Sequence, residues 1–121
     1  RRNIIGAAHF SAEQCDDTTL VRLVDTSRFH TDQYAQLQQD LEDFVERQQP
    51  RKLLVDLGNI EYGSSALISV LLIAQKCVEA GAGVMRLFGT REVMLETLQC
   101  LNLTGTRFSV YVDETAAKNA F

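Results

Sequence analysis

The chain has 121 residues, of which 45% are hydrophobic and 23% are charged, and its formal net charge is −4. This length and composition can bury one hydrophobic core, so we expect a single domain over residues 1–121, with the leading Arg1 consistent with a fragment of a longer protein. The net negative charge, and basic runs no longer than the pairs at residues 1–2 and 51–52, argue against a nucleic-acid partner.

Three cysteines, Cys15, Cys77 and Cys100, stand at wide and irregular spacing. Because no C-x-x-C pair is present, the sequence predicts no metal site. No cofactor is expected either. Cys77 and Cys100 fall on apolar faces of expected helices, so they should be small buried residues. The longest apolar stretch, residues 66–74 interrupted by Ser69, is too short for a transmembrane helix, and no signal peptide is recognisable. We therefore expect a cytoplasmic protein without direct membrane insertion.

The first part of the chain predicts two strands. Residues 3–10 form a modest strand weakened by Gly6, and the polar segment at residues 11–19 is typical of a turn. Residues 20–24 alternate between apolar and polar side chains around Arg22, which is typical of a half-buried strand.

An amphipathic helix should begin at Thr31, its expected N-cap, and run to Gln49, where Pro50 ends it. Its apolar side chains recur at helical spacing: Tyr34, Leu37, Leu41, Phe44 and Val45. Residues 52–57 then carry the apolar run LLVDL, which is typical of a central strand buried on both faces, and the pair at residues 58–59 breaks it.

A second helix at residues 66–80 follows a pair of serines and should be heavily buried. It should end at AGAG, residues 80–83, where glycine tolerates a left-handed cap. Its apolar stripe consists of Leu67, Val70, Leu71, Ala74, Cys77 and Val78, widened by Ile68, Leu72 and Ile73.

Residues 84–88 predict another strand, and Thr90 is the expected N-cap of a third helix that ends at Leu101. Four of its side chains should face inward: Val93, Met94, Leu98 and Leu101. A last strand at residues 107–112 and a short helix capped by Asp113 complete the chain. The order β-β-α-β-α-β-α-β-α predicts an α/β fold, a single mixed or mostly parallel sheet of about five strands with about four helices packed on it.

The adjacent serines raise the question of catalysis. A serine nucleophile elbow needs glycine two residues before and two residues after the serine, and for Ser65 the residue Gly63 fits but Leu67 does not. The only histidines, His9 and His30, have no recognisable acid partner in the sequence. The glycine patterns that bind nucleotide phosphates are also absent. The sequence therefore predicts no enzyme.

The segment FGTRE at residues 88–92 places glycine, threonine and arginine at a strand-to-helix turn. Such a turn could bind an anion, although helix capping by Thr90 is a sufficient explanation.

The segment LLVDLGNIEYGSSALISVLL, residues 53–72, resembles the STAS domain family, the fold of bacterial anti-sigma factor antagonists. The family pattern is an apolar strand followed by D-L-S-G-V-x-F-[IM]-D-S-[SAT]-G-L-G-V-L. An ungapped alignment matches Asp56, Leu57, Ile60 and Tyr62, places Asn59 on a family glycine, and matches VLL at residues 70–72. The resemblance extends over nearly the whole chain, including the preceding amphipathic helix, AGAGVMRLFG and VMLETLQCLNLTG.

The resemblance implies a regulatory binding module. In anti-sigma factor antagonists, a partner kinase that is also the anti-sigma factor phosphorylates a serine at the start of this helix. The unmodified domain binds the kinase and frees the sigma factor, whereas the phosphorylated domain is released. The alignment places the acceptor at Ser65, and a one-residue shift that requires a deletion would place it at Ser64.

Three positions near the acceptor depart from the family pattern. Ser64 replaces the usual acid, Leu67 replaces a glycine, and Arg28 stands where the loop after the second strand should carry an acid. A serine is also among the best N-caps, so in the structural interpretation Ser64 caps the helix and Ser65 is only a small first-turn residue. The expected partner-binding face comprises Asp25, Arg28, His30, Tyr62, Gly63, Ser64, Ser65, Leu67 and Ile68.

Three hypotheses follow. The first is an anti-sigma factor antagonist that binds a serine-kinase anti-sigma factor and is controlled by phosphorylation. The second keeps the fold without the switch, as a scaffold or homodimerising module of a larger sensory or transport system. The third is a sensor of a small ligand or nucleotide that uses the FGTRE turn.

Overall fold

The strands form one six-stranded mixed sheet in the order β1-β2-β3-β4-β5-β6. The computed structural model describes residues 2–6 and 9–121, with side chains from residue 9 onward. The strands β1, β2 and β3 pair antiparallel, whereas β3, β4, β5 and β6 pair parallel. Their bounds are β1 Arg2–Gly6, β2 Phe10–Cys15, β3 Thr18–Leu23, β4 Lys52–Asp56, β5 Val84–Phe88 and β6 Ser109–Tyr111.

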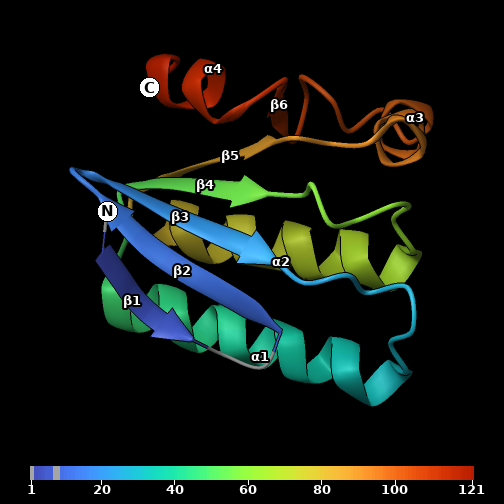
Figure 1. Ribbon diagram of the computed structural model, residues 1–121, viewed down its shortest axis with the longest axis horizontal. Helices are drawn as coiled ribbons and strands as arrows, with labels where there is room; N and C mark the ends of the chain where they lie inside the picture. The colour runs from blue at the N-terminus through green and yellow to red at the C-terminus, as the bar shows by residue number, and fades with distance from the viewer. Residues whose placement is uncertain (1, 7–8) are drawn as a thin grey trace.

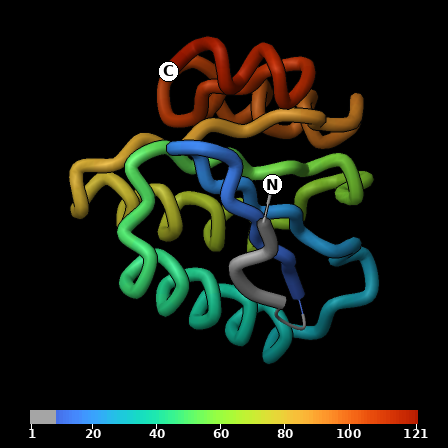
Figure 2. The backbone as a smooth tube through the Cα atoms, turned by 60° about the vertical axis from the view of Figure 1, so that its left-hand side comes forward, coloured from blue at the N-terminus to red at the C-terminus, as the bar shows by residue number. Residues whose placement is uncertain are grey.

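In the described part of the chain, three helices connect the parallel strands and a fourth follows β6: α1 Thr31–Gln48, α2 Ser65–Ala80, α3 Glu92–Cys100 and α4 Glu114–Asn119. Each crossover between parallel strands leads to the neighbouring strand in the same direction across the sheet. Because such crossovers are right-handed, their helices lie on the same side of the sheet. Figures 1 and 2 show α1 and α2 side by side on one face, with α4 on the other. The expected α/β architecture is confirmed.

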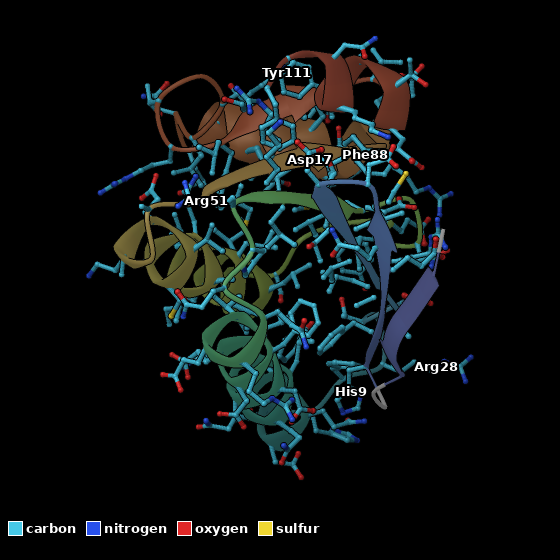
Figure 3. All side chains as sticks on the ribbon, turned by 90° about the vertical axis from the view of Figure 1, so that its left-hand side faces the viewer. His9, Asp17, Arg28, Arg51, Phe88 and Tyr111 are labelled. Carbon is cyan, nitrogen blue, oxygen red and sulfur yellow. The ribbon has the colours of Figure 1, made fainter. Side chains whose placement is uncertain are left out.

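The central strand β4 is buried on both faces, as its apolar run predicts. Leu53 and Val55 belong to the large core beneath α1 and α2, to which α3 contributes Met94 and Leu98. Leu54 points the other way into a smaller core under α4, formed with Leu20, Phe88 and Ala117 and bordered by Tyr111 and Phe121. Figure 3 shows Phe88 and Tyr111 near α4. The sheet therefore separates two cores of unequal size.

The turn expected at residues 11–19 is wrong, because most of that segment forms β2 and the start of β3. The tight turn is confined to residues 16–17, where Asp16 has a left-handed φ of 56°. Ala12 is fully buried, yet the polar side chains around it conceal the strand pattern. The strand expected at residues 3–10 is divided between β1 and β2, and its residues 7–8 lie outside the described part of the chain.

Three expected caps differ in the structure. His30, not Thr31, is the N-cap of α1, and its backbone N–H donates to the Gln33 side chain at 2.7 Å. Arg91, not Thr90, is the N-cap of α3. At the end of α2, the residue with the left-handed φ, of 65°, is Ala82 and not a glycine. Glycine is required at position 83 for a different reason, because a Cβ there would clash with the Pro50 carbonyl oxygen.

Several side chains expected to be buried are exposed. Val93 and Leu101 were predicted to face inward, but α3 has only nine residues and reaches the core through Met94 and Leu98 alone. The prediction that Cys100 is buried is wrong for the same reason. Cys77 is partly buried against the large core, and burial raises the pKa of its thiol, with Glu42 and Glu46 adding a smaller effect. Among the described residues, no helix combines the length and apolar character needed to cross a bilayer.

Candidate functional site

The turn between β4 and α2 is held to its neighbours by side-chain hydrogen bonds. At the end of β4, the Asp56 carboxylate accepts the Gly58 N–H at 2.8 Å and the Arg22 Nε–H at 2.8 Å. The Asn59 side chain donates to the Leu23 carbonyl at 3.1 Å, and Ile60 is buried in the core. These contacts fix the position from which α2 begins.

Ser64 is the N-cap of α2, as expected. Its hydroxyl oxygen accepts the Leu67 N–H at 3.1 Å, which satisfies one of the free amides at the helix start. The same hydroxyl donates to the Tyr34 hydroxyl at 3.1 Å, and Tyr34 in turn donates to the Thr26 carbonyl at 3.2 Å. The Ser64 hydroxyl is therefore used both as an acceptor and as a donor.

Ser65 is the first residue of α2, and its environment is different. Its side chain is exposed, and it makes no hydrogen bond within the described part of the chain. An exposed hydroxyl at a helix N-terminus is accessible to another protein. It also lies where backbone amides and the helix dipole favour negative charge. Of the two serines, Ser65 is thus the one whose hydroxyl has no hydrogen-bond partner among the described residues.

The loop after β3, residues 25–30, is ordered by Asp25. Its carboxylate accepts the Ser27 N–H at 2.9 Å and the Ser27 hydroxyl at 3.0 Å. These two hydrogen bonds lower the pKa of Asp25 below its ordinary value, with smaller contributions from Arg28 and Arg91. Phe29 packs edge-on against the Tyr34 ring, and the Thr26 carbonyl also accepts the Phe29 N–H at 3.0 Å. Tyr34 thereby joins this loop to the start of α2.

Two hollows flank the start of α2. The first, of about 750 Å³, lies between α1 and α2 and is lined by Phe29, His30, Thr31, Asp32, Tyr34, Ala35, Ser64 and Ala66. The second, of about 400 Å³, lies between α2 and α3 and is lined by Gly63, Ser65, Ile68, Val93, Glu96, Thr97, Cys100 and Leu101. The two serines consequently face different hollows.

The structure brings together most of the residues expected on the partner-binding face. His30 and Ser64 line the α1–α2 hollow, whereas Gly63, Ser65 and Ile68 line the α2–α3 hollow. Two of the residues expected on the binding face belong to the core instead: Leu67 is 0% exposed and Ile68 is 6% exposed, because both pack on the inward side of α2.

The remaining expected residues are exposed but line neither hollow. Tyr62 is half exposed beside Gly63, and Asp25 and Arg28 are exposed on the loop at residues 25–30. Figure 3 labels Arg28 and His9 at the same end of the molecule, and the His9 ring packs edge-on against Phe29.

Sequence reasoning missed the contribution of α3 and the role of Tyr34. The signal for Tyr34 was a polar hydroxyl on an otherwise apolar helix stripe. No comparable signal marked Val93 or Leu101, because helical spacing alone predicted that they would face inward.

The FGTRE turn at residues 88–92 packs against the ends of β4 and β6 through Gly89. Gly89, with a φ of 72°, donates its N–H to the Tyr111 carbonyl at 3.2 Å. A Cβ added to Gly89 would lie 3.3 Å from the Asp56 carboxylate. This carboxylate is already paired with Arg22 and with the Gly58 N–H. Anion binding at the FGTRE turn therefore stays a prediction.

Comparison with known proteins identifies the family. The model of the STAS domain family matches residues 9–117. The chain belongs to the STAS domain family. No curated protein sequence matches the chain significantly. The family expected from residues 53–72 is thereby confirmed, while the roles of individual residues remain predictions.

Solved structures share the STAS fold with this chain. An anti-sigma-factor antagonist (STAS) domain protein from Planctomyces limnophilus is 22% identical, with 93% of this chain and 97% of that chain covered and a TM-score of 0.79. An anti-sigma factor antagonist from Mycobacterium paratuberculosis is 18% identical, with 96% and 97% covered and a TM-score of 0.76. The Bacillus cell fate determinant SpoIIAA in its phosphorylated form is 17% identical, with 93% and 99% covered and a TM-score of 0.64. At these identities, the likeness shows a common STAS fold.

Proposed function

We propose that this STAS protein is an anti-sigma factor antagonist that binds a serine-kinase anti-sigma factor and is released when Ser65 is phosphorylated. The observation that carries the proposal is the exposed, unpaired hydroxyl of Ser65 at the first residue of α2, in a chain of this family. The proposal places the protein in the cytoplasm, where an ATP-dependent kinase would reach it.

The physical effect of a phosphate at Ser65 supports the switch. A phosphoserine adds about −1.5 to −2 charges at neutral pH. The amides and the dipole at the start of α2 favour that charge within the isolated protein. In a complex, the phosphate would have to be desolvated among the exposed apolar side chains that line the α2–α3 hollow, Val93 and Leu101. Phosphorylation should therefore weaken binding without unfolding the domain.

Ser65 is a better acceptor than Ser64 on structural grounds. Phosphorylating Ser64 would require its hydroxyl to abandon both the Leu67 amide and the Tyr34 hydroxyl. The SpoIIAA structure shows that a protein of this fold occurs in a phosphorylated form. Position 64 carries an acid in the family pattern and a serine in this chain. Either residue type can cap a helix, and Ser64 is the N-cap of α2.

The test is phosphorylation of the purified protein by anti-sigma kinases of the source organism, with ATP, followed by mass spectrometry. We expect one phosphate on Ser65 and its loss in Ser65→Ala. Ser64→Ala is the matched control: it should retain phosphorylation and lose about 1 kcal/mol of stability through the missing cap, measured by urea unfolding. Phosphate confined to Ser64, or kinase binding that Ser65→Asp leaves unchanged, would contradict the proposal.

A constitutive scaffold or homodimerising STAS module is the second candidate. It is favoured by the replacement of the family acid and glycine by Ser64 and Leu67 on either side of Ser65. This candidate predicts that no kinase modifies Ser65 and that Ser65→Asp leaves self-association and partner binding unchanged. Sedimentation velocity on the wild type and on Ser65→Asp distinguishes it from the first.

A further inference from the structure

A hollow between the second half of α2 and residues 103–107, the Gln75 hollow, lies apart from the serine pair. Its volume is about 240 Å³. The α2 residues of its lining run from Leu72 to Glu79, which places them about 10–20 Å along the helix axis from Ser65. The proposed function makes no use of this hollow.

A buried glutamine is the unexpected feature of this hollow. Gln75 is 7% exposed, and the other buried residues of α2 are all apolar. Its side-chain N–H donates to the Arg107 carbonyl, whereas its side-chain oxygen accepts no hydrogen bond from a described residue. No described side-chain oxygen is both fully buried and without a partner, so this oxygen reaches the surface of the hollow that Gln75 lines. It is an acceptor available to an N–H group of a ligand.

The wall of the hollow opposite α2 is held by backbone hydrogen bonds. The Leu103 carbonyl accepts the Arg107 N–H at 3.0 Å and the Phe108 N–H at 2.8 Å, and the Phe108 carbonyl accepts the Gly105 N–H at 2.8 Å. Phe108 is buried in the large core, and the Gln75 side chain joins this wall to α2. The hollow is therefore formed without a ligand, which lowers the entropic cost of binding one.

Three charged side chains of both signs line the hollow. Lys76 and Arg107 are positive, and Glu79 is negative. All three are exposed, and none of them forms an ion pair with another described residue. Their charges are therefore available to a ligand, and a ligand that carries charges of both signs complements them.

The rest of the lining is aliphatic. Leu72, Ile73 and Leu103 are partly buried and provide an apolar surface. The volume of the hollow is below the range of about 300–1,000 Å³ that is usual for drug-sized ligands. The ligand should therefore be small, with a short apolar part.

We propose that the Gln75 hollow binds a free α-amino acid with an aliphatic side chain. The ammonium group of the amino acid donates to the Gln75 oxygen and faces Glu79, while its carboxylate faces Arg107 and Lys76. Its side chain packs on the aliphatic part of the lining. A simple anion suits the hollow less well, because it would meet the Gln75 acceptor and the Glu79 carboxylate.

The test is an NMR titration of the ¹⁵N-labelled protein with L-leucine. We expect saturable shifts of the Gln75 side-chain N–H signals and of the Arg107 amide, which lie at the hollow. Two probes each lack one charged group: 4-methylpentanoate has no amine, and 3-methylbutylamine has no carboxylate. Each should bind at least about tenfold more weakly, because it loses charge-assisted hydrogen bonds.

Charge-removing substitutions locate the site on the protein. Arg107→Gln and Glu79→Gln should each raise the dissociation constant for L-leucine about threefold to tenfold. Both side chains are exposed, so circular dichroism should show folded variants. Arg51→Gln and Glu61→Gln are the matched controls, because they remove the same charges from exposed positions outside the hollow. They should bind within about twofold of the wild type.

The experiment contains no kinase, so its failure leaves the proposed function standing. The absence of saturable shifts at millimolar L-leucine overturns the inference. Equal binding of L-leucine and 4-methylpentanoate also overturns it, since the ammonium group would then not be recognised. Unchanged affinity in both Arg107→Gln and Glu79→Gln would place the bound amino acid elsewhere on the protein and likewise contradict the assignment.

Discussion

Two adjacent serines behave differently because their hydroxyls have different neighbours. The Ser64 hydroxyl is enclosed between the Leu67 amide and the Tyr34 hydroxyl, whereas the Ser65 hydroxyl faces solvent. Residue type alone cannot separate them, because serine is suitable both as an N-cap and as a first-turn residue. At this scale, the hydrogen bonds identify Ser64 as the helix cap, whereas modification of Ser65 stays a prediction.

Asp25 gives a prediction at the same scale. Hydrogen bonds from Ser27, first from its N–H and then from its hydroxyl, hold the pKa of Asp25 below the ordinary value of 3.8. Because the folded-state pKa is the lower one, the carboxylate stabilises the loop above about pH 3.8, and this contribution is lost as the pH falls through the folded-state pKa. We expect Ser27→Ala to raise the pKa of Asp25 towards 3.8 in a carbon-detected NMR titration. Identical titration curves for the two proteins would contradict this account of the loop.

At the scale of elements, Tyr34 joins α1, the start of α2 and the loop at residues 25–30. It accepts from Ser64 and donates to the buried Thr26, while its ring packs on Phe29. Tyr34 therefore links the loop to the helix start, the two halves of the expected binding face, in addition to the contacts that each makes on its own.

Tyr34→Phe tests this connection. Removing the hydroxyl keeps the ring packing but leaves Ser64 without its acceptor and Thr26 without one of its donors. We expect a loss of about 1 kcal/mol in stability, and faster hydrogen exchange of the Phe29 and Leu67 amides. Tyr62→Phe is the matched control, since the Tyr62 side chain is half exposed and makes no hydrogen bond within the described part of the chain. Unchanged exchange in Tyr34→Phe would show that the loop is held by other contacts.

At the scale of the whole molecule, the sheet divides the protein into two cores. The smaller core depends on Leu54, which is 1% exposed and packs with Leu20, Phe88 and Ala117 beneath α4. The opposite face of the same strand carries α1 and α2, which present the candidate site. The short helix α4 therefore protects the face of the sheet that the site does not use.

Leu54→Ala should be severely destabilising, because it leaves a cavity in the central strand. We expect a loss of about 2–5 kcal/mol in urea unfolding, the range seen when buried leucines are truncated. Val84→Ala on the neighbouring strand removes a side chain that is 46% exposed, and should change stability by no more than about 0.5 kcal/mol. A cost below about 1 kcal/mol for Leu54→Ala would mean that the smaller core contributes little to the fold.

Local sequence patterns were sufficient for most of the elements. The periodicity of α1 and α2, the two-sided strand β4 and the caps at Ser64 and Asp113 were all predicted and are confirmed. These features depend on residues close together in the chain, so their signals are contained in short segments. The strand β2 was missed because its stability comes from pairing with β1 and β3. Its polar residues give no sign of that pairing in the sequence.

The sequence by itself determined the family and the alternation of strands and helices. It also identified the serine pair as the candidate functional site. Only the tertiary structure showed that Leu67 is buried and that the Ser64 hydroxyl donates a hydrogen bond to Tyr34. It also showed that Val93 and Leu101 are exposed and line the same hollow as Ser65. The physical reason is that helical spacing states which residues share a face, while burial depends on what packs against that face. For α3, two side chains reach the core, and the rest of its apolar surface remains open next to the candidate acceptor.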